Sequence, residues 1–188
     1  IIRSALRVCA ALLLGLALLA GTGGTASAAP VAAEAAAVRT IRYDATRSAE
    51  FRSAVDEGAR IWNDRVSNVR LVAGSPADVV IVADDGWPRA RVTSLGRGTI
   101  WMGRQAVREG HYTVRIASHE LGHILGLPDR RTGRCTDLMS GASAGTSCRN
   151  PDPNSAEIAE VERNFANGLI SVATGTTRSS TPRRCESR

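Results

Sequence analysis

The sequence predicts a domain of the α+β class, built from short strands and amphipathic helices. Two observations lead to this fold class. Segments with alternating or continuous apolar residues are typical of strands, and they lie at 38–43, 69–72, 78–83 and 99–102. Segments with apolar residues every three or four positions are typical of amphipathic helices, and they lie at 49–66, 112–125 and 154–169. The length of 188 residues suits one domain flanked by processing segments.

The first elements are a strand and a helix. Val38–Tyr43 alternates apolar and polar residues, as a strand does. Ser48 is a suitable N-cap for the helix over 49–66, with Glu50 in its first turn. The apolar face of this helix consists of Phe51, Val55, Ala59, Trp62 and Val66.

Three strands are expected in the middle of the chain. Val69–Val72 is short, and Asp78–Ala83 is apolar almost throughout, as buried strands are. The stretch 86–98 contains proline and glycines and is expected to be a loop. The strand over Thr99–Met102 follows it directly.

The second half is predicted to be helical at both ends. Tyr112–Leu125 forms a helix that carries two of the three histidines. Residues 127–153 are rich in glycine, proline and serine and show no regular period. Asn154 or Ser155 can cap a final helix. Its apolar face consists of Ile158, Val161, Phe165 and Leu169.

Both ends of the chain differ in composition from the domain over 38–169. Two arginines, a short apolar run and an Ala-x-Ala site over 1–29 predict a secretory signal peptide and an extracellular protein. A membrane anchor is the alternative, which the short apolar run disfavours. The alanine-rich residues 30–37 are expected to be a short pro-segment. Residues 170–188 are expected to be a disordered basic tail.

The net charge of +6 comes from 24 basic residues, all of them arginine, against 18 acidic ones. Much of the excess lies in the two end segments, so the domain itself is nearly neutral. No run of basic and aromatic residues is present, and we therefore expect no nucleic-acid partner.

Four cysteines are present, and export to an oxidising compartment favours disulfides. Cys9 would leave with the signal peptide. Cys135 and Cys148 bracket one compact loop and are the natural pair, worth roughly 3 kcal/mol. Cys185 is left over as a free thiol, an intermolecular partner or part of a trimmed segment.

The stretch from Ser118 to Asp129 carries the chemistry. His119 and His123 are four residues apart, so they share one helix face and can bind one ion. A catalytic zinc needs a third protein ligand and an open position for water. Gly126 lets the chain leave the helix, and Asp129 can then return to the metal. His111 is the alternative third ligand, but it precedes the helix.

Glu120 lies beside the expected metal position, where it can act as general base toward a zinc-bound water. The competing interpretation is that the two helix histidines are structural, with their hydrogen bonds made within the protein and no metal bound. Downstream, Asp137-Leu138-Met139-Ser140 is a candidate Met-turn, in which Met139 supports the site without touching the metal. The alternative is that Met139 only fills the core.

These motifs together resemble those of the snapalysins, small extracellular neutral proteases within the metzincin class of zinc enzymes. The likeness runs from about Val38 to Gly168. It includes Ile61-Trp62-Asn63, Val66 to Leu71, Gly96-Arg97-Gly98, Ser118 to Asp129, Asp137 to Gly141, Ser147-Cys148 and Ala166-Asn167-Gly168.

The resemblance implies a small metzincin-like zincin fold, with a mixed twisted sheet, an active-site helix, a Met-turn and a C-terminal helix. It implies one zinc ion on His119, His123 and Asp129, catalysis by Glu120 and a Cys135–Cys148 disulfide. The implied activity is cleavage of protein or peptide substrates, with an aromatic residue favoured just after the cut. Thr99, Ile100, Trp101 and Met102 would form the rim strand that pairs with substrate.

The sequence departs from this family in several places. Snapalysins can bind calcium through an aspartate and a threonine, but Tyr112 and Val114 stand there, so calcium is not expected. Gly141 replaces a tyrosine that larger metzincins often use.

We expect a monomer, with no membrane partner once the signal is removed. The competing functions are a zinc amidase acting on small or cell-wall peptides and a non-catalytic, zinc-stabilised binding module.

Overall fold

The computed structural model describes residues 38–166 and 183–186. These residues belong to one compact unit, Ala35–Arg188. The predicted signal peptide, the predicted pro-segment and most of the predicted tail lie outside the described residues. Among the helices of the described part, none has the length and apolar character needed to cross a membrane.

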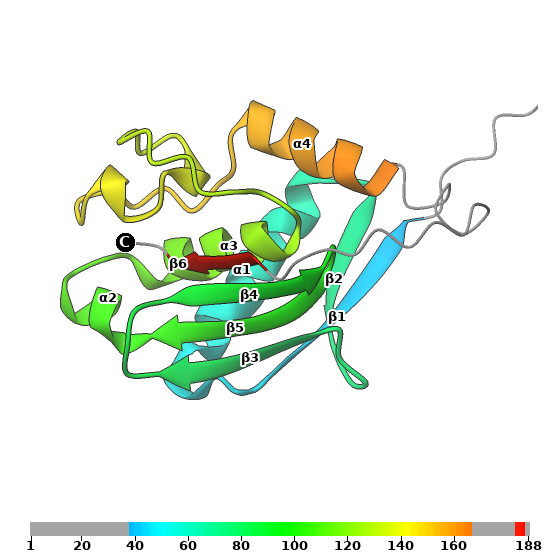
Figure 1. Cartoon of the computed structure of the whole chain (residues 1–188), viewed down its shortest axis with the longest axis horizontal. Coiled ribbons are helices and arrows are strands. Elements are labelled where there is room, and N and C mark those ends of the chain that lie inside the picture. Colours follow the sequence, from blue (N-terminus) through cyan, green and yellow to red (C-terminus); the bar gives the residue numbers. More distant parts are fainter. Residues whose placement is uncertain (1–37, 167–182, 187–188) are drawn as a thin grey trace, which may run out of the picture. The chain divides into compact units, whose positions relative to one another are not determined.

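A mixed sheet forms one layer of this unit (Figure 1). Its strands are β1 (Arg39–Arg47), β2 (Val69–Ala73), β3 (Val79–Asp84), β4 (Arg89–Ser94), β5 (Arg97–Gly103) and β6 (Arg183–Glu186). They are ordered β2-β1-β3-β5-β4-β6. The first four strands in this order are parallel, and β4 and β6 are antiparallel to their neighbours. The predicted α+β class is confirmed.

The helices pack on one another and on this sheet (Figure 1). They are α1 (Arg52–Arg65), α2 (Arg104–Arg108), α3 (Thr113–Ile124) and α4 (Ser155–Ala166), with 3-10 turns η1 (Ala49–Phe51) and η2 (Leu138–Ala144). Contacts join α1 to β2, and α3 to β4 and β5. A Cβ on Gly58 of α1 would lie 3.0 Å from the backbone nitrogen of Ser118, so glycine permits the close approach of α1 to α3.

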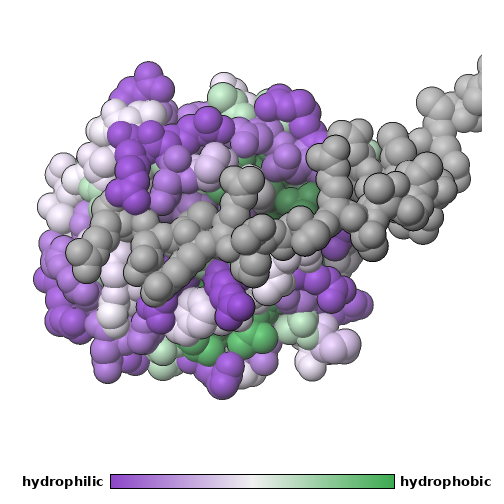
Figure 2. All heavy atoms as spheres, viewed as in Figure 1, coloured by the Kyte–Doolittle hydropathy of each residue, from purple (hydrophilic) through white to green (hydrophobic). Residues whose placement is uncertain are grey.

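The core follows the predicted apolar faces. Phe51, Val55, Ala59, Trp62 and Val66 are all buried. Alternate residues of β1 are also buried, as expected for a sheet with one face on the core. On the face shown in Figure 2, hydrophilic residues cover most of the described surface, with only small apolar areas between them.

The predicted loop over 86–98 was wrong, because β4 lies within it. Ala90 is fully buried and Val92 is half-buried, while Arg91 between them is exposed. This period of two is that of a strand. Pro88 precedes the strand and Gly96, at φ +80°, forms the turn into β5. Proline and glycine therefore bracket a strand here instead of marking a loop. The short helix α2 was also not predicted.

The predicted N-cap at Ser48 takes another role. Its hydroxyl donates to the Ala45 carbonyl over 2.7 Å and caps no helix amide. At the other end of the domain, Asn154 does cap α4, since its Oδ1 accepts from the Glu157 amide over 2.9 Å.

The chain forms a strand in part of the region expected to be a disordered tail. Residues Arg183–Glu186 make β6, which pairs antiparallel with β4. Without β6 the outer edge of β4 would present unpaired backbone groups, and such groups favour an added strand. Residues 170–182 and 187–188 of the predicted tail lie outside the described part.

Candidate active site

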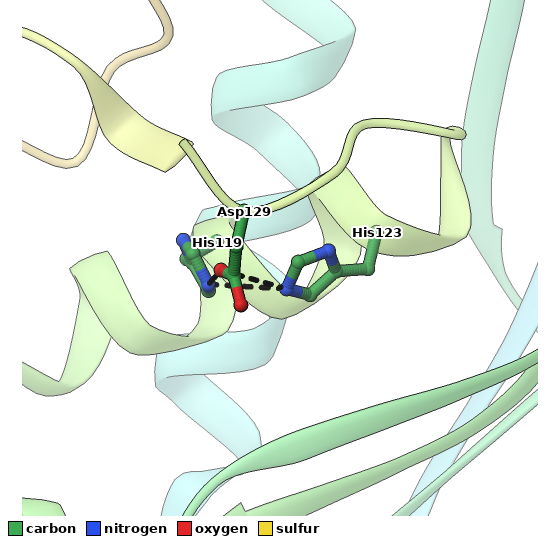
Figure 3. A group of neighbouring side chains, drawn as sticks. All are labelled: His119, His123 and Asp129. Carbon is green, nitrogen blue, oxygen red and sulfur yellow. Dashed lines mark hydrogen bonds and ion pairs between the residues drawn. The ribbon is translucent and has the colours of Figure 1, made fainter. Parts of the chain in front are cut away.

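Two histidines on one face of α3 meet an aspartate from the loop that follows (Figure 3). The Nε2 atoms of His119 and His123 are 3.1 Å apart. Asp129 Oδ1 lies 3.2 Å from His119 Nε2 and 3.5 Å from His123 Nε2. The helical spacing of four residues and the turn at Gly126, at φ +95°, bring the three side chains together.

The outer ring nitrogens of both histidines face main-chain carbonyls. His119 Nδ1 lies 3.0 Å from the Leu138 oxygen, and His123 Nδ1 lies 2.8 Å from the Leu127 oxygen. A carbonyl can only accept, so each Nδ1 must carry the hydrogen. In the neutral rings both Nε2 atoms then present lone pairs toward Asp129 Oδ1.

This cluster fits a metal ion by its chemistry and its spacing. Two nitrogen lone pairs and a carboxylate oxygen converge on one point, and such a set repels itself unless a cation lies between its members. Ligands of a tetrahedral zinc ion at about 2.0–2.1 Å lie about 3.3 Å from one another. The three distances of 3.1, 3.2 and 3.5 Å match that spacing.

The pKa values of the two histidines also reflect how closely the three side chains lie. Burial lowers the pKa of His119, but the hydrogen bond to Asp129 and the nearby charge of Glu120 raise it above its usual value overall. Burial and the neighbouring His119 lower the pKa of His123 to about 4. Near neutral pH the pair therefore carries at most one positive charge, because His123 stays neutral and keeps its Nε2 lone pair available for a ligand bond.

Asp129 divides its two oxygens between partners. Oδ1 faces the histidines, and Oδ2 lies 3.5 Å from an Arg131 guanidinium nitrogen. Burial raises the pKa of Asp129, but the hydrogen bond to His119 and the nearby positive charges lower it overall. The carboxylate is thus held ionised, which is the form that binds metal.

A pocket opens beside the cluster, and Glu120 lines it together with His119. The side chain of Glu120 is fully buried. Trp87 and His111 also line the pocket, with their rings edge to face and 5.7 Å between centroids. His111, the alternative third ligand, therefore lies on the pocket wall and outside the metal cluster.

We call η2 and the disulfide loop Cys135–Cys148 the floor of the site. Met139, from η2, is fully buried and lies against α3 at Gly122, where a Cβ would come 2.8 Å from its sulfur. Gly141, at φ +60°, approaches His119, and a Cβ there would lie 3.3 Å from His119 Cε1. The predicted turn thus lies against the helix that carries the histidines. The predicted disulfide is formed, with 5.4 Å between the Cα atoms.

Two buried charges hold the floor in place. Arg115 on α3 donates from one guanidinium nitrogen to the carbonyls of Asp137 and Leu138 and from the other to those of Cys135 and Asn150. The Leu138 carbonyl also faces His119 Nδ1, so Arg115 supports the partner of a metal-site histidine.

Glu157 on α4 is the second of these charges. It accepts from the backbone amides of Leu138 over 3.2 Å and Met139 over 2.8 Å. It also accepts from the Asn154 amide over 2.7 Å, which completes a reciprocal capping box with Asn154. Sequence reasoning missed Arg115 and Glu157. The Asn-x-x-Glu spacing signals the helix start but not the contact with the floor.

Comparison with known proteins now bears on this site. A model of the Streptomyces extracellular neutral proteinase (M7) family matches residues 37–168. The chain belongs to this family.

Several M7 relatives carry the name extracellular small neutral protease. The protein of Streptomyces coelicolor is 43% identical over 137 residues, which are 71% of this chain and 63% of that protein. The protein of Streptomyces lividans is 40% identical over 137 residues, covering 72% of this chain and 60% of that protein. The protein of Streptomyces caespitosus is 39% identical over 131 residues, which are 69% of this chain and 98% of that protein.

The chain spans less than two thirds of the length of the first two relatives. Its match with the M7 family model, by contrast, includes α3, the loop to Asp129, the floor and α4. The resemblance to the small neutral proteases is therefore confirmed at the level of the family.

One predicted site element of this M7 chain is corrected by the sheet topology. Thr99–Met102 lies within β5, which pairs with β3 on one side and β4 on the other. Its backbone groups are occupied inside the sheet, so it cannot add a substrate strand. The next strand outward is β4, which we call the rim. The rim begins directly after Trp87 and Pro88, which line the pocket.

Proposed function

We propose that this chain is a secreted, zinc-dependent endopeptidase that hydrolyses peptide bonds in proteins. The convergence of His119 Nε2, His123 Nε2 and Asp129 Oδ1 beside the pocket that Glu120 lines is the observation that carries the proposal. Membership of the M7 family and the extracellular names of the relatives support it.

The three ligand residues would hold one zinc ion per chain. A bound zinc ion supplies activation of water and polarisation of the scissile carbonyl. His119 and His123 are held in the required tautomer by their Nδ1 partners, so they need no rearrangement to bind.

Glu120 would move the proton. It lies one residue after His119 on α3 and shares the wall of the same pocket. A carboxylate there can accept a proton from the attacking water and deliver it to the leaving amine. Its burial excludes bulk water, which strengthens its interaction with charge that develops in the transition state.

The pocket supports a preference for an aromatic residue just after the cut. Its wall carries Trp87, Pro88, Ala106 and Ile116, with the rings of His111 and Tyr112. Aromatic groups favour offset or edge-to-face packing against such rings. The substrate backbone would run along the rim, where an extended peptide can add to the sheet.

The test is a Glu120→Gln variant of the secreted protein. We expect hydrolysis of casein and of an internally quenched peptide to fall by about 10²–10⁴-fold, because the general base is lost. Native mass spectrometry should still find one zinc ion per chain, because Glu120 is not a ligand. Glu160→Gln, a change at a partly exposed ion pair on α4, is the matched control and should keep activity.

Persistent activity of Glu120→Gln would contradict the mechanism. A cleavage map on a mixed peptide library tests the substrate class separately. Internal cuts before aromatic residues support the proposal, and cuts confined to very small peptides would favour an amidase.

A further inference from the structure

The outer edge of the rim leads directly to the active site. Among the described strands, β4 lies next to last in the sheet, and its inner edge pairs with β5. Trp87 and Pro88 precede it and line the pocket that also contains His119 and Glu120. A peptide extended along the outer edge of β4 therefore ends at the catalytic pocket.

That outer edge is occupied by a segment of the same chain. β6 pairs with it antiparallel (Figure 1), and the register joins Arg89 to Glu186, Ala90 to Cys185, Arg91 to Arg184 and Val92 to Arg183. The direction follows from the register. β6 runs from the far end of the rim toward the pocket, and Glu186 lies opposite the residue that follows Pro88.

We propose that Arg183–Glu186 is an internal competitor of the substrate, taking the rim position that an extended substrate peptide would occupy. The inference rests on the proposed peptidase function. Backbone pairing at a sheet edge is a general way of binding extended peptides and is nearly independent of sequence. The chain can therefore occupy its own substrate position at the rim.

The strength of this contact suits reversible inhibition by β6. Four residue pairs form only a short strand, and short strands are weak in isolation. Residues 167–182 join β6 covalently to α4, so the pairing is intramolecular, and such a connection corresponds to an effective concentration in the millimolar range. The weakly paired β6 then competes with a dilute substrate but is displaced by a substrate that is long or concentrated. Proteolytic cleavage before residue 183 would release β6 and end this inhibition.

The experiment uses the full chain and two matched double variants. Arg184→Pro with Cys185→Pro removes two consecutive backbone amides from β6, and because successive amides of a strand point to opposite sides, one of the two faces β4 and its hydrogen bond is lost. Arg184→Ala with Cys185→Ala removes the same side chains and keeps the amides. We expect the KM for an extended peptide to be about threefold to tenfold lower in the proline variant than in the alanine variant. The kcat should be equal, because the catalytic residues are untouched.

A second measurement does not depend on activity. In a Glu120→Gln background, hydrogen exchange at those amides of Arg89–Val92 that face β6 should be slow in the alanine variant and faster in the proline variant. Protection of Ile100 and Met102 in β5 should be the same in both, which controls for a general loss of stability.

The outcomes separate the two proposals. Equal KM values in the two variants overturn the competitor role, even where exchange at the rim differs. Equal exchange at the rim overturns the pairing itself. Absence of cleavage by both variants and by the parent chain contradicts the proposed function, and the exchange experiment then decides alone whether β6 holds the rim.

Discussion

The floor and the rim of the site are held by different kinds of interaction. On the floor, two buried charges, Arg115 and Glu157, bind main-chain carbonyls and amides of the turn that carries Met139. At the rim, β4 is held by backbone pairing and by the partly exposed ion pair between Asp84 and Arg89.

The two kinds of interaction match two different requirements: the ligand geometry must be fixed, and the substrate must be able to enter. Charged hydrogen bonds in a buried setting are strong and directional, so they suit a floor that fixes the ligand geometry. A strand edge exchanges one extended partner for another at little cost, which suits a surface that must admit peptides. Disruption of the floor should therefore cost stability and metal binding, and disruption of the rim should cost far less.

Glu157→Ala is expected to have the largest effect. It leaves the buried amides of Leu138 and Met139 without their acceptor, and each such loss costs about 1–3 kcal/mol. We expect the free energy of unfolding to fall by about 3–5 kcal/mol, measured by urea denaturation at fixed zinc concentration. Glu160→Ala on the same helix should cost less than about 1 kcal/mol. Similar losses in the two variants would show that the floor is not held in this way.

Gly141→Ala is expected to have an intermediate effect that falls on the metal. Gly141 and Gly145 both have positive φ, so alanine costs about 1–3 kcal/mol of backbone strain at either position. Only at Gly141 does the new Cβ crowd a ligand, since no atom lies within 4 Å of the Cβ at Gly145. Zinc affinity from chelator competition should fall about tenfold or more in Gly141→Ala alone. Equal affinities in both variants would contradict the close approach of the turn to His119.

Asp84→Asn at the rim is expected to have the smallest effect. The hydrogen bond from Arg89 lowers the pKa of Asp84 below its usual value. The unfolded chain therefore binds the proton more readily, and the ion pair stabilises the fold above about pH 4 and ceases to do so as the pH falls through the lowered pKa. In chelator, to exclude metal effects, the variant should be less stable than the parent by at most about 1 kcal/mol at pH 7. A difference that does not shrink as the pH falls below about 4 would argue against the ion pair.

Much of the fold and of the metal cluster could be predicted because the signals are local. The apolar period of 49–66 identified a helix whose whole predicted face is buried. His119 and His123 are four residues apart, and Asp129 follows after one glycine turn, so the spacing alone indicated the cluster that the structure brings together. What sequence spacing indicates well is geometry within one element and its adjoining turn.

The remaining features depend on contacts between distant residues. Arg115 meets Asn150 across 35 positions, and Glu157 meets the floor 18 and 19 positions away, so no local pattern reveals either contact. The rim was missed for another reason. Ala90 is a weak strand former and arginines flank it, so only the alternation of burial identifies β4. Once that strand was taken for a loop, β5 was wrongly placed at the edge of the sheet.

The carbonyl partners of the two metal-site histidines have a consequence for how this site changes over evolutionary time. Both Nδ1 atoms face oxygens of the main chain, at Leu127 and Leu138. Every amino acid supplies that oxygen, so no single replacement at either position can delete it. Drift at these positions can alter packing, yet the tautomer that leaves Nε2 open is inherited with the path of the backbone.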